Sequence, residues 1–190
     1  MNSQFFEDEH FEKKDFSIDQ FPQADYEACT FNNCNFSAVD LGGSKFTDCE
    51  FIECDLSNTK LSKTVIQDCS FSHCKMIGLR FDLCEGFGFS ISATNCVLNH
   101  SSFFNVKTPN TNFSNTKLQN VDFTEAVLIN SNFHACDFSE AIFENTNIEK
   151  ADFREAINYS IDPENNKISR AHFSIPEVTG LLDKYQLKIE

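Results

Sequence analysis

The sequence has few basic residues: 15 Lys and Arg stand against 29 Asp and Glu, and the formal net charge at pH 7 is −14. Nucleic-acid binding through a basic face is disfavoured, because a chain of this charge repels phosphates. The sequence also lacks the run of about 18 apolar residues that a membrane-spanning helix needs. Its start, MNSQFFEDEH, lacks the basic and apolar regions of a signal peptide. We therefore expect a soluble, cytoplasmic protein.

The motifs of common enzyme classes are missing as well. There is no G-x-S-x-G, no phosphate-binding loop and no Cys beside a His at a plausible site. The five His are scattered, at positions 10, 73, 100, 134 and 172. Catalysis needs a cleft with convergent polar groups, so we expect neither an enzyme nor a bound cofactor.

Nine cysteines are present, an odd number in a chain without an export signal, which favours reduced thiols over a disulfide framework. In the stretch TDCEFIECDL, Cys49 and Cys54 each precede a large apolar residue by two positions. Metal binding, disulfide bonding and packing are the three possible roles. Zinc sites use spacings of the C-x2-C type, which do not occur here, and a free Cys behaves as a small buried hydrophobe. Packing is the favoured interpretation.

Large apolar residues recur at every fifth position. One series runs from Tyr26 to Phe81, and a second, moved by two positions, runs from Leu98 to Phe153 with only Thr108 breaking it. A period of five fits neither a helix, at 3.6, nor a strand, at 2. A chain that turns through a fixed angle every five residues would aim all these side chains at one axis, so the period predicts a solenoid.

Charge spacing indicates how many groups of five make one coil. A coil of 15 residues would stack Asp25 on Asp40, whereas a coil of 20 stacks Asp25 on Lys45. Opposite charges on neighbouring strands are favourable, although each exposed pair contributes only about 0.2–1 kcal/mol. The cysteine pairs 29/34, 49/54 and 69/74 also repeat every 20 residues. Four sides per coil are therefore predicted, with the following charge pairs stacked: Asp25 on Lys45, Asp40 on Lys60, Asp55 on Lys75, and Lys117 on Asp137.

Stretches such as VDFTE, SNFHA, CDFSE and ADFRE resemble the pentapeptide-repeat family, whose motif is roughly A(D/N)LXX. The resemblance covers about residues 24–157. It implies an all-β fold, a right-handed quadrilateral parallel β-helix with one pentapeptide on each side and four in each coil. The motif describes the interior of the rod, so it says little about function.

The repeat divides the chain into five segments. They are residues 1–23, an irregular first coil or N-terminal cap; 24–85, the first repeat segment; 86–97, a register shift with a bulge or small loop; 98–157, the second repeat segment; and 158–190, a C-terminal cap or dimerisation segment. The first segment is expected to be irregular because Glu9, Lys14 and Asp19 occupy positions that are small elsewhere, and charges do not belong in a stacked core. The shift can be a tolerated bulge or a function-bearing protrusion.

The tail contains an S-x-x-E capping box, Ser174 to Glu177, with a Pro in the first turn, which predicts a short helix from about residue 175. Its apolar residues have helical spacing. They are Val178, Leu181, Leu182 and Tyr185. This helix can cover the last coil, whose backbone and apolar surface need protection, or it can pack on a second copy of the chain.

Within the family, the tail segments IDPENNKI and FSIPE are similar to the ending of the microcin immunity protein, and the chain resembles the Qnr-type quinolone-protection branch. This resemblance implies a homodimer through the tail and an acidic, DNA-mimicking rod that binds DNA gyrase or topoisomerase IV and protects it from quinolones or related toxins. The candidate contacts are outward acids of the second repeat segment: Asp122, Glu125, Asp137, Glu140, Glu144, Glu149, Asp152 and Glu155.

The charge distribution leaves a second function open. Residues 61–120 carry 3 acids and 5 bases, which makes a poor continuous DNA mimic. The alternative is a structural scaffold or adaptor for an unrelated protein partner. One continuous acidic stripe on the folded surface would favour the first function, and scattered charges the second.

Overall fold

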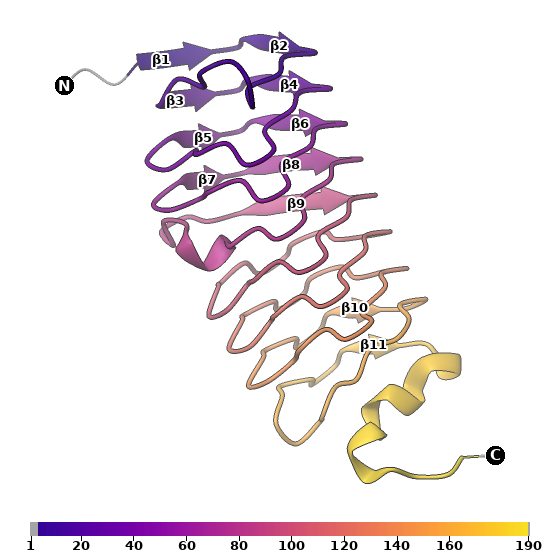
Figure 1. The fold of residues 1–190 in the computed structure, drawn as a ribbon. Coiled ribbons are helices and arrows are strands. Elements are labelled where there is room, and N and C mark those ends of the chain that lie inside the picture. Colours follow the sequence, from indigo (N-terminus) through magenta and orange to yellow (C-terminus); the bar gives the residue numbers. More distant parts are fainter. Residues whose placement is uncertain (1–3, 190) are drawn as a thin grey trace.

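The computed structural model describes residues 4–189, which form a rod of stacked coils with the two chain ends at opposite ends of the rod (Figure 1). Each coil of 20 residues has four sides, as the charge spacing predicts. The strands are β1 (Gln4–Glu7), β2 (His10–Glu12), β3 (Ala24–Glu27), β4 (Thr30–Asn32), β5 (Lys45–Thr47), β6 (Glu50–Ile52), β7 (Val65–Gln67), β8 (Cys69–Ser72), β9 (Ile91–Thr94), β10 (Asp152–Phe153) and β11 (His172–Phe173). All of their pairings are parallel.

The four sides are named here as faces A to D in chain order. Face A begins with the sheet β1-β3-β5-β7, and face B with the sheet β2-β4-β6-β8-β9, which β10 and β11 extend at the far end. Faces C and D are built from single β-bridges between coils. The ladder of face C runs through Asp15, Asn35, Asp55, Lys75, Val97, Lys117, Asp137 and Ile157.

The four stacked charge pairs are confirmed as ladder neighbours. They are Asp25 with Lys45, Asp40 with Lys60, Asp55 with Lys75, and Lys117 with Asp137. In the third pair, Lys75 Nζ lies 3.3 Å from Asp55 Oδ2. Opposite charges on neighbouring coils therefore fix the same 20-residue register as the apolar repeat.

The corner after each side is a residue with positive φ, two positions beyond the large apolar residue. Asn accepts this left-handed conformation more readily than most residues. Asn holds eight of these corners between residues 95 and 158 but only two before residue 80. The five-residue period is thus a turn repeated at a fixed spacing.

Aromatic side chains fill the interior in stacks along the rod. On face B, Phe51 lies between Phe31 and Phe71 with ring centroids 4.8 Å apart on both sides. Further along the same face, Phe133 lies 5.3 Å from Phe113 and 4.9 Å from Phe153. Stacked aromatic pairs add about 0.5–1.5 kcal/mol to the free energy gained by burial alone. The predicted convergence of every fifth side chain is confirmed.

The nine cysteines are free thiols that pack in this interior, eight buried and Cys84 half-buried. The eight buried sulfurs contact carbonyls of the preceding coil; Cys54 Sγ lies 3.3 Å from Phe31 O. Hydroxyls at the same inner position also bond to these carbonyls, and Thr146 Oγ1 donates to Phe123 O at 2.8 Å. Burial raises the pKa of the Cys136 thiol to about 12. Thiols in such surroundings are inert packing groups.

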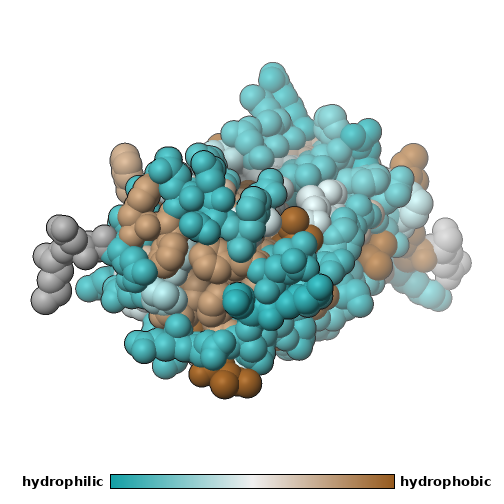
Figure 2. All heavy atoms as spheres, turned by 90° about the horizontal axis from the view of Figure 1, so that it is seen from above, coloured by the Kyte–Doolittle hydropathy of each residue, from teal (hydrophilic) through white to brown (hydrophobic). Residues whose placement is uncertain are grey.

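The first coil is more regular than the sequence indicates. β1 pairs with β3 and β2 with β4 in the common register, and the irregular backbone is confined to about residues 17–23. Glu9, Lys14 and Asp19 are exposed at the end of the described rod. Seen from this end, apolar atoms lie in the middle of the rod within a ring of hydrophilic ones (Figure 2). Charges along an open sheet edge oppose the addition of another strand.

The tail ends in two 3-10 helices, η2 (Ile175–Leu181) and η3 (Asp183–Tyr185), packed at the end of the rod (Figure 1). The helix starts where expected, but the predicted capping box is wrong: no side chain caps η2. Ser174 Oγ instead accepts a hydrogen bond of 2.9 Å from Glu155 N, because Ser174 lies beside the preceding coil. Within residues 4–189, no helix has the length and apolar character to cross a membrane.

The register shift lies at η1 (Phe81–Leu83), a short turn that projects from the side of the rod (Figure 1). Here the ladder partners are 22 residues apart instead of 20, as in Lys75 with Val97 and Arg80 with Ser102. Faces B and C continue across the shift. In the described part of the chain, face A shows no ladder pairing between β7 and Lys107, so the two extra residues are absorbed on this face.

Candidate functional site

The eight candidate acids of the second repeat segment are distributed over all four faces. Five of them lie on a face: Asp122 and Glu144 on face D, Asp137 on face C, Glu149 on face A and Asp152 on face B. The other three lie at the corner that follows a face: Glu125 after face D, Glu140 after face C and Glu155 after face B. Glu125 and Glu144 are neighbours, since Glu125 N donates to Glu144 O at 2.8 Å. The set does not form one acidic stripe.

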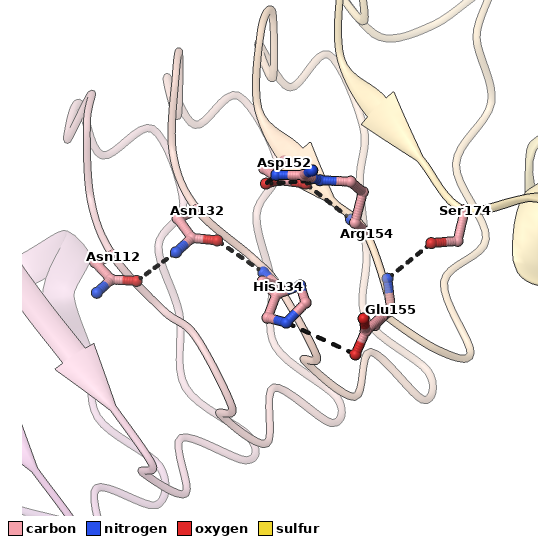
Figure 3. Close-up of polar contacts among 7 residues, drawn as sticks. All are labelled: Asn112, Asn132, His134, Asp152, Arg154, Glu155 and Ser174. Atoms are coloured by element: carbon pink, nitrogen blue, oxygen red, sulfur yellow. Dashed lines mark hydrogen bonds and ion pairs between the residues drawn. The ribbon is translucent and has the colours of Figure 1, made fainter.

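On face B, both candidate acids have cationic or imidazole neighbours (Figure 3). Arg154 donates from Nε and Nη2 to the carboxylate of Asp152, at 2.9 and 2.6 Å. This hydrogen bonding lowers the pKa of Asp152. His134 Nε2 lies 3.7 Å from Glu155 Oε2. Asp152 is therefore neutralised locally, whereas Glu155, whose side chain is 72% exposed, has only an imidazole beside it.

Asp137 is held by neutral hydrogen-bond donors on face C. Its carboxylate accepts from Gln119 Nε2 at 2.6 Å, from Asn158 Nδ2 at 2.8 Å and from Ser139 Oγ at 2.7 Å. Partial burial raises the pKa of Asp137, but these bonds outweigh burial and hold the pKa at about 2. Three donors to one carboxylate indicate a structural role between coils.

A denser group of acids lies on the edge between faces A and B in the first four coils, and sequence reasoning missed it. This acidic ridge consists of seven exposed residues: Glu7, Asp8, Glu9, Glu27, Asp48, Glu50 and Asp68. Glu7 and Glu27 are direct ladder partners, and like charges in this position are destabilising. Among residues 4–189, no member of the ridge is in an ion pair.

The charge density of the ridge can be compared with that of DNA. Four coils span three steps of about 4.8 Å each, or about 14 Å. Seven carboxylates over this length give about one negative charge per 2 Å, close to the value of about 1.7 Å for duplex DNA. The signal was available in the sequence, because Asp8, Asp48 and Asp68 share one corner once the coil is known to have 20 residues.

Three of the four apolar residues proposed for dimerisation are exposed: Val178, Leu182 and Tyr185. Leu181 instead packs against the core. Leu182 also lines a shallow groove of about 320 Å³ with Leu187 and Ile189. Tyr185 has a local partner, because its hydroxyl donates to Glu164 Oε1 at 2.9 Å. The tail thus covers the last coil and leaves an apolar outer surface.

Metal ligation has no support in the part of the chain that the structure describes, where no group of three or more His, Cys, Asp or Glu side chains could hold an ion. The acids of the ridge project outward along the edge rather than toward a common point. The arrangement is suited to contact with an extended, positively charged surface.

Two family models match the chain: the pentapeptide repeat region over residues 91–153, and pentapeptide repeats (8 copies) over residues 29–68 and 49–85. By sequence alone, the chain has no significant match among curated proteins.

Solved structures with similar folds include two of QnrB1, a plasmid-mediated fluoroquinolone resistance protein. Full-length QnrB1 is 17% identical, with a TM-score of 0.55 over 96% of this chain and 100% of QnrB1. A trypsin-treated QnrB1 variant is 18% identical, with a TM-score of 0.63 over 99% of each chain. HetL from the cyanobacterium Nostoc sp., which is involved in regulating heterocyst differentiation, is 14% identical, with a TM-score of 0.55 over 89% of this chain and 84% of HetL. At these identities, the likeness concerns the fold.

Proposed function

The chain belongs to the pentapeptide-repeat family, and from this premise we propose that it is a non-enzymatic protein that binds DNA gyrase or topoisomerase IV through its acidic ridge. In this proposal, the ridge occupies part of the basic groove that holds DNA and protects the enzyme from quinolones or related toxins. The likeness to a fluoroquinolone resistance protein over almost the full length of both chains supports this choice of partner.

The observation that carries the proposal is the unpaired charge of the ridge. Its seven carboxylates have about the linear charge density of duplex DNA, and the fold holds two of them, Glu7 and Glu27, side by side without a counterion. Such a surface attracts a basic groove at long range, which raises the association rate and makes binding sensitive to salt. The ridge replaces the eight acids of the second repeat segment as the main contact in this proposal.

A supercoiling assay with purified gyrase and ciprofloxacin tests this function. The wild-type protein should restore supercoiling in the presence of the drug, and the effect should fall as salt is raised. A ridge variant, Asp48→Asn with Glu50→Gln and Asp68→Asn, should need at least ten times more protein for the same effect. The matched control, Asp122→Asn with Glu125→Gln and Glu144→Gln, should act as the wild type does.

The outcomes separate the alternatives. If only the control variant lost protection, the acids of the second repeat segment, and not the ridge, would be the contact with the enzyme. An absence of protection, of inhibition and of salt-dependent binding, for gyrase and topoisomerase IV alike, would exclude topoisomerases as partners.

We also propose that the protein is a homodimer joined through the tail. Val178, Leu182 and Tyr185 are exposed at the end of the rod, and the neighbouring groove gives a second copy an apolar surface to cover. Sedimentation should show a dimer at tens of micromolar, and Val178→Asp with Leu182→Asp should give a monomer. A monomeric wild-type protein at that concentration would contradict the proposal.

The second candidate function is a scaffold or adaptor for an unrelated protein partner. It is favoured by the scatter of the second-segment acids over four faces, where Asp137 and Asp152 are held by local partners. If the supercoiling assay excludes topoisomerases, this function becomes the preferred one.

A further inference from the structure

A groove opens beside η1, where face A lacks a coil strand. It has a volume of about 560 Å³, within the usual range for binding pockets. Its apolar lining includes Phe81, Phe89, Phe104 and Val106, and Lys107 stands at its border. The half-buried Cys84 also lines it, but burial raises the pKa of this thiol to about 12, so it is not a reactive group.

Exposed apolar side chains occur in the groove lining and next to it in the sequence. Phe87 follows Gly86, which lines the groove, and is 84% exposed; Leu83 and Phe104 are 48% and 44% exposed. Single apolar residues on a surface are common, but a group of them beside a groove marks an interaction site. Phe87 is the most exposed aromatic residue in the described chain.

The backbone holds Phe87 in place. Phe87 and Gly88 form a turn, in which Gly88 has a φ of +72° and Gln67 Nε2 donates to Phe87 O at 3.2 Å. The positive φ of Gly88 favours glycine, and a Cβ at this position would displace the side-chain amide of Gln67 that holds Phe87 O. A contact residue whose backbone is held before binding loses less backbone entropy when a partner covers it.

The charges around the groove differ from those of the rest of the protein. Two lysines, Lys63 and Lys107, are exposed here, and within residues 4–189 neither is in an ion pair. Lys63 lies beside η1, because its backbone N–H donates to Leu83 O at 2.9 Å. Asp82 is neutralised by Arg80, whose Nε donates to it at 2.8 Å. Glu85 is the remaining acid of the segment. Two lysines outside ion pairs thus lie at this groove, Lys107 in its lining and Lys63 beside η1, on a protein of charge −14.

We propose that this groove, with Phe87 at its side, docks a segment of a partner protein that carries an apolar anchor flanked by carboxylates. The anchor fills the space between Phe81, Phe89 and Phe104, and the carboxylates pair with Lys63 and Lys107. A buried apolar anchor with charged groups at the rim is the usual arrangement of an energetic hot spot. The site adjoins the last member of the acidic ridge, since Asp68 accepts a hydrogen bond of 2.8 Å from Ser90 Oγ. It attracts the opposite charge, however, so it goes beyond the proposed function and does not depend on it.

A synthetic peptide provides a direct test, because the protein contains no Trp and a Trp in the peptide can be followed alone. The probe is acetyl-Asp-Glu-Trp-Leu-Glu-Asp-amide, titrated with the wild-type protein by tryptophan fluorescence and anisotropy. We expect saturable binding with a blue shift and a Kd below about 1 mM, or about −4 kcal/mol. Phe87→Ser and Lys107→Glu should each weaken binding at least tenfold.

Ile18→Ser is the matched control, because Ile18 is 83% exposed at the N-terminal end of the rod and far from the groove in the sequence. This variant should bind the peptide as the wild type does. A second peptide, in which Lys replaces every Asp and Glu, should bind at least tenfold more weakly to the groove. Amide chemical shifts should change at residues 81–89 and 104–107.

Four results would overturn the proposal. They are no binding at about 1 mM peptide, equal binding by the Phe87→Ser protein, equal or tighter binding of the lysine peptide at the groove, and shift changes confined to other parts of the rod. Circular dichroism of each variant checks the fold, and Phe87 and Lys107 are exposed, so both substitutions should leave it intact.

Discussion

The two halves of the rod use the same coil but differ in the residues at its corners. Between residues 95 and 158, Asn holds eight positive-φ corners, whereas the corners before residue 80 include Asp8, Asp48 and Asp68 on one edge. Asn suits the left-handed conformation without adding charge. The second half therefore has more of the corner residues that the fold prefers, and the first half carries the longer series of adjacent like charges. Residues that work against the fold in this way are expected where a surface has a binding function.

The halves also differ at the small inner position. Most inner residues of the first half are Cys, and those of the second half are mainly Thr, Ser and Ala. Both kinds of side chain contact the same carbonyl of the preceding coil, at 2.8 Å for Thr146 and 3.3 Å for Cys74. The inner position is thus filled mostly by thiols in the first half and by hydroxyls or small apolar groups in the second.

The largest expected effect on stability concerns the aromatic stacks, which both halves contain. Phe51→Ala and Phe133→Ala should each lower the free energy of unfolding by about 3–5 kcal/mol, because each removes a ring from the middle of a stack. Urea denaturation followed by circular dichroism measures both. The exposed Phe87→Ala should change stability by less than about 0.5 kcal/mol. An unchanged stability for Phe51→Ala would contradict the stacking, and a gap above about 2 kcal/mol between the two core variants would mean that the halves are not equivalent.

A smaller effect should separate thiols from hydroxyls. Thr146→Val should cost about 1 kcal/mol, because Phe123 O loses a buried hydrogen bond. Cys74→Val should cost less, since its sulfur contact to Phe51 O is long and weak. Val fits this position, as the buried Val121 shows. Equal losses in the two variants would remove the distinction between the halves at the inner position.

The smallest effect tests the corners. Asp48→Asn should raise stability by a few tenths of a kcal/mol, because Asn keeps the left-handed corner and one ridge charge is removed. The reciprocal Asn110→Asp, on the same edge in the second half, should lower it by a similar amount. Scanning calorimetry should show opposite changes in Tm of about 1 °C. A loss of stability in Asp48→Asn would mean that this acid serves the fold rather than a partner.

The sequence was sufficient to predict the repeat, the four-sided coil and the interior. The five-residue period identified the inward side chains, and the Asp25–Lys45 spacing identified the coil of 20, because both depend only on distance along the chain. The capping box at Ser174 was wrong because a neighbouring coil, remote in sequence, uses the same hydroxyl.

The surfaces were harder to predict for a physical reason. Counting charge along the chain selected the acids after residue 121, but the fold distributes consecutive acids over different faces. The ridge forms from residues 20 or 40 positions apart, and it becomes visible only when corners are aligned coil by coil. The sequence located two extra residues near Gly86 and Gly88, but not the groove, which exists because faces B and C continue while face A is interrupted.

A coil of four identical quarters also restricts how such a rod can gain or lose length. Deleting residues 104–123 would remove one whole circuit, shorten the rod by about 4.8 Å and leave every later side chain on its present face. Deleting five residues at the same point would rotate all that follows by a quarter turn and move Asp152 from face B to face A. Only whole circuits, or residues diverted into a side loop as at η1, preserve the orientation of one end of the rod relative to the other.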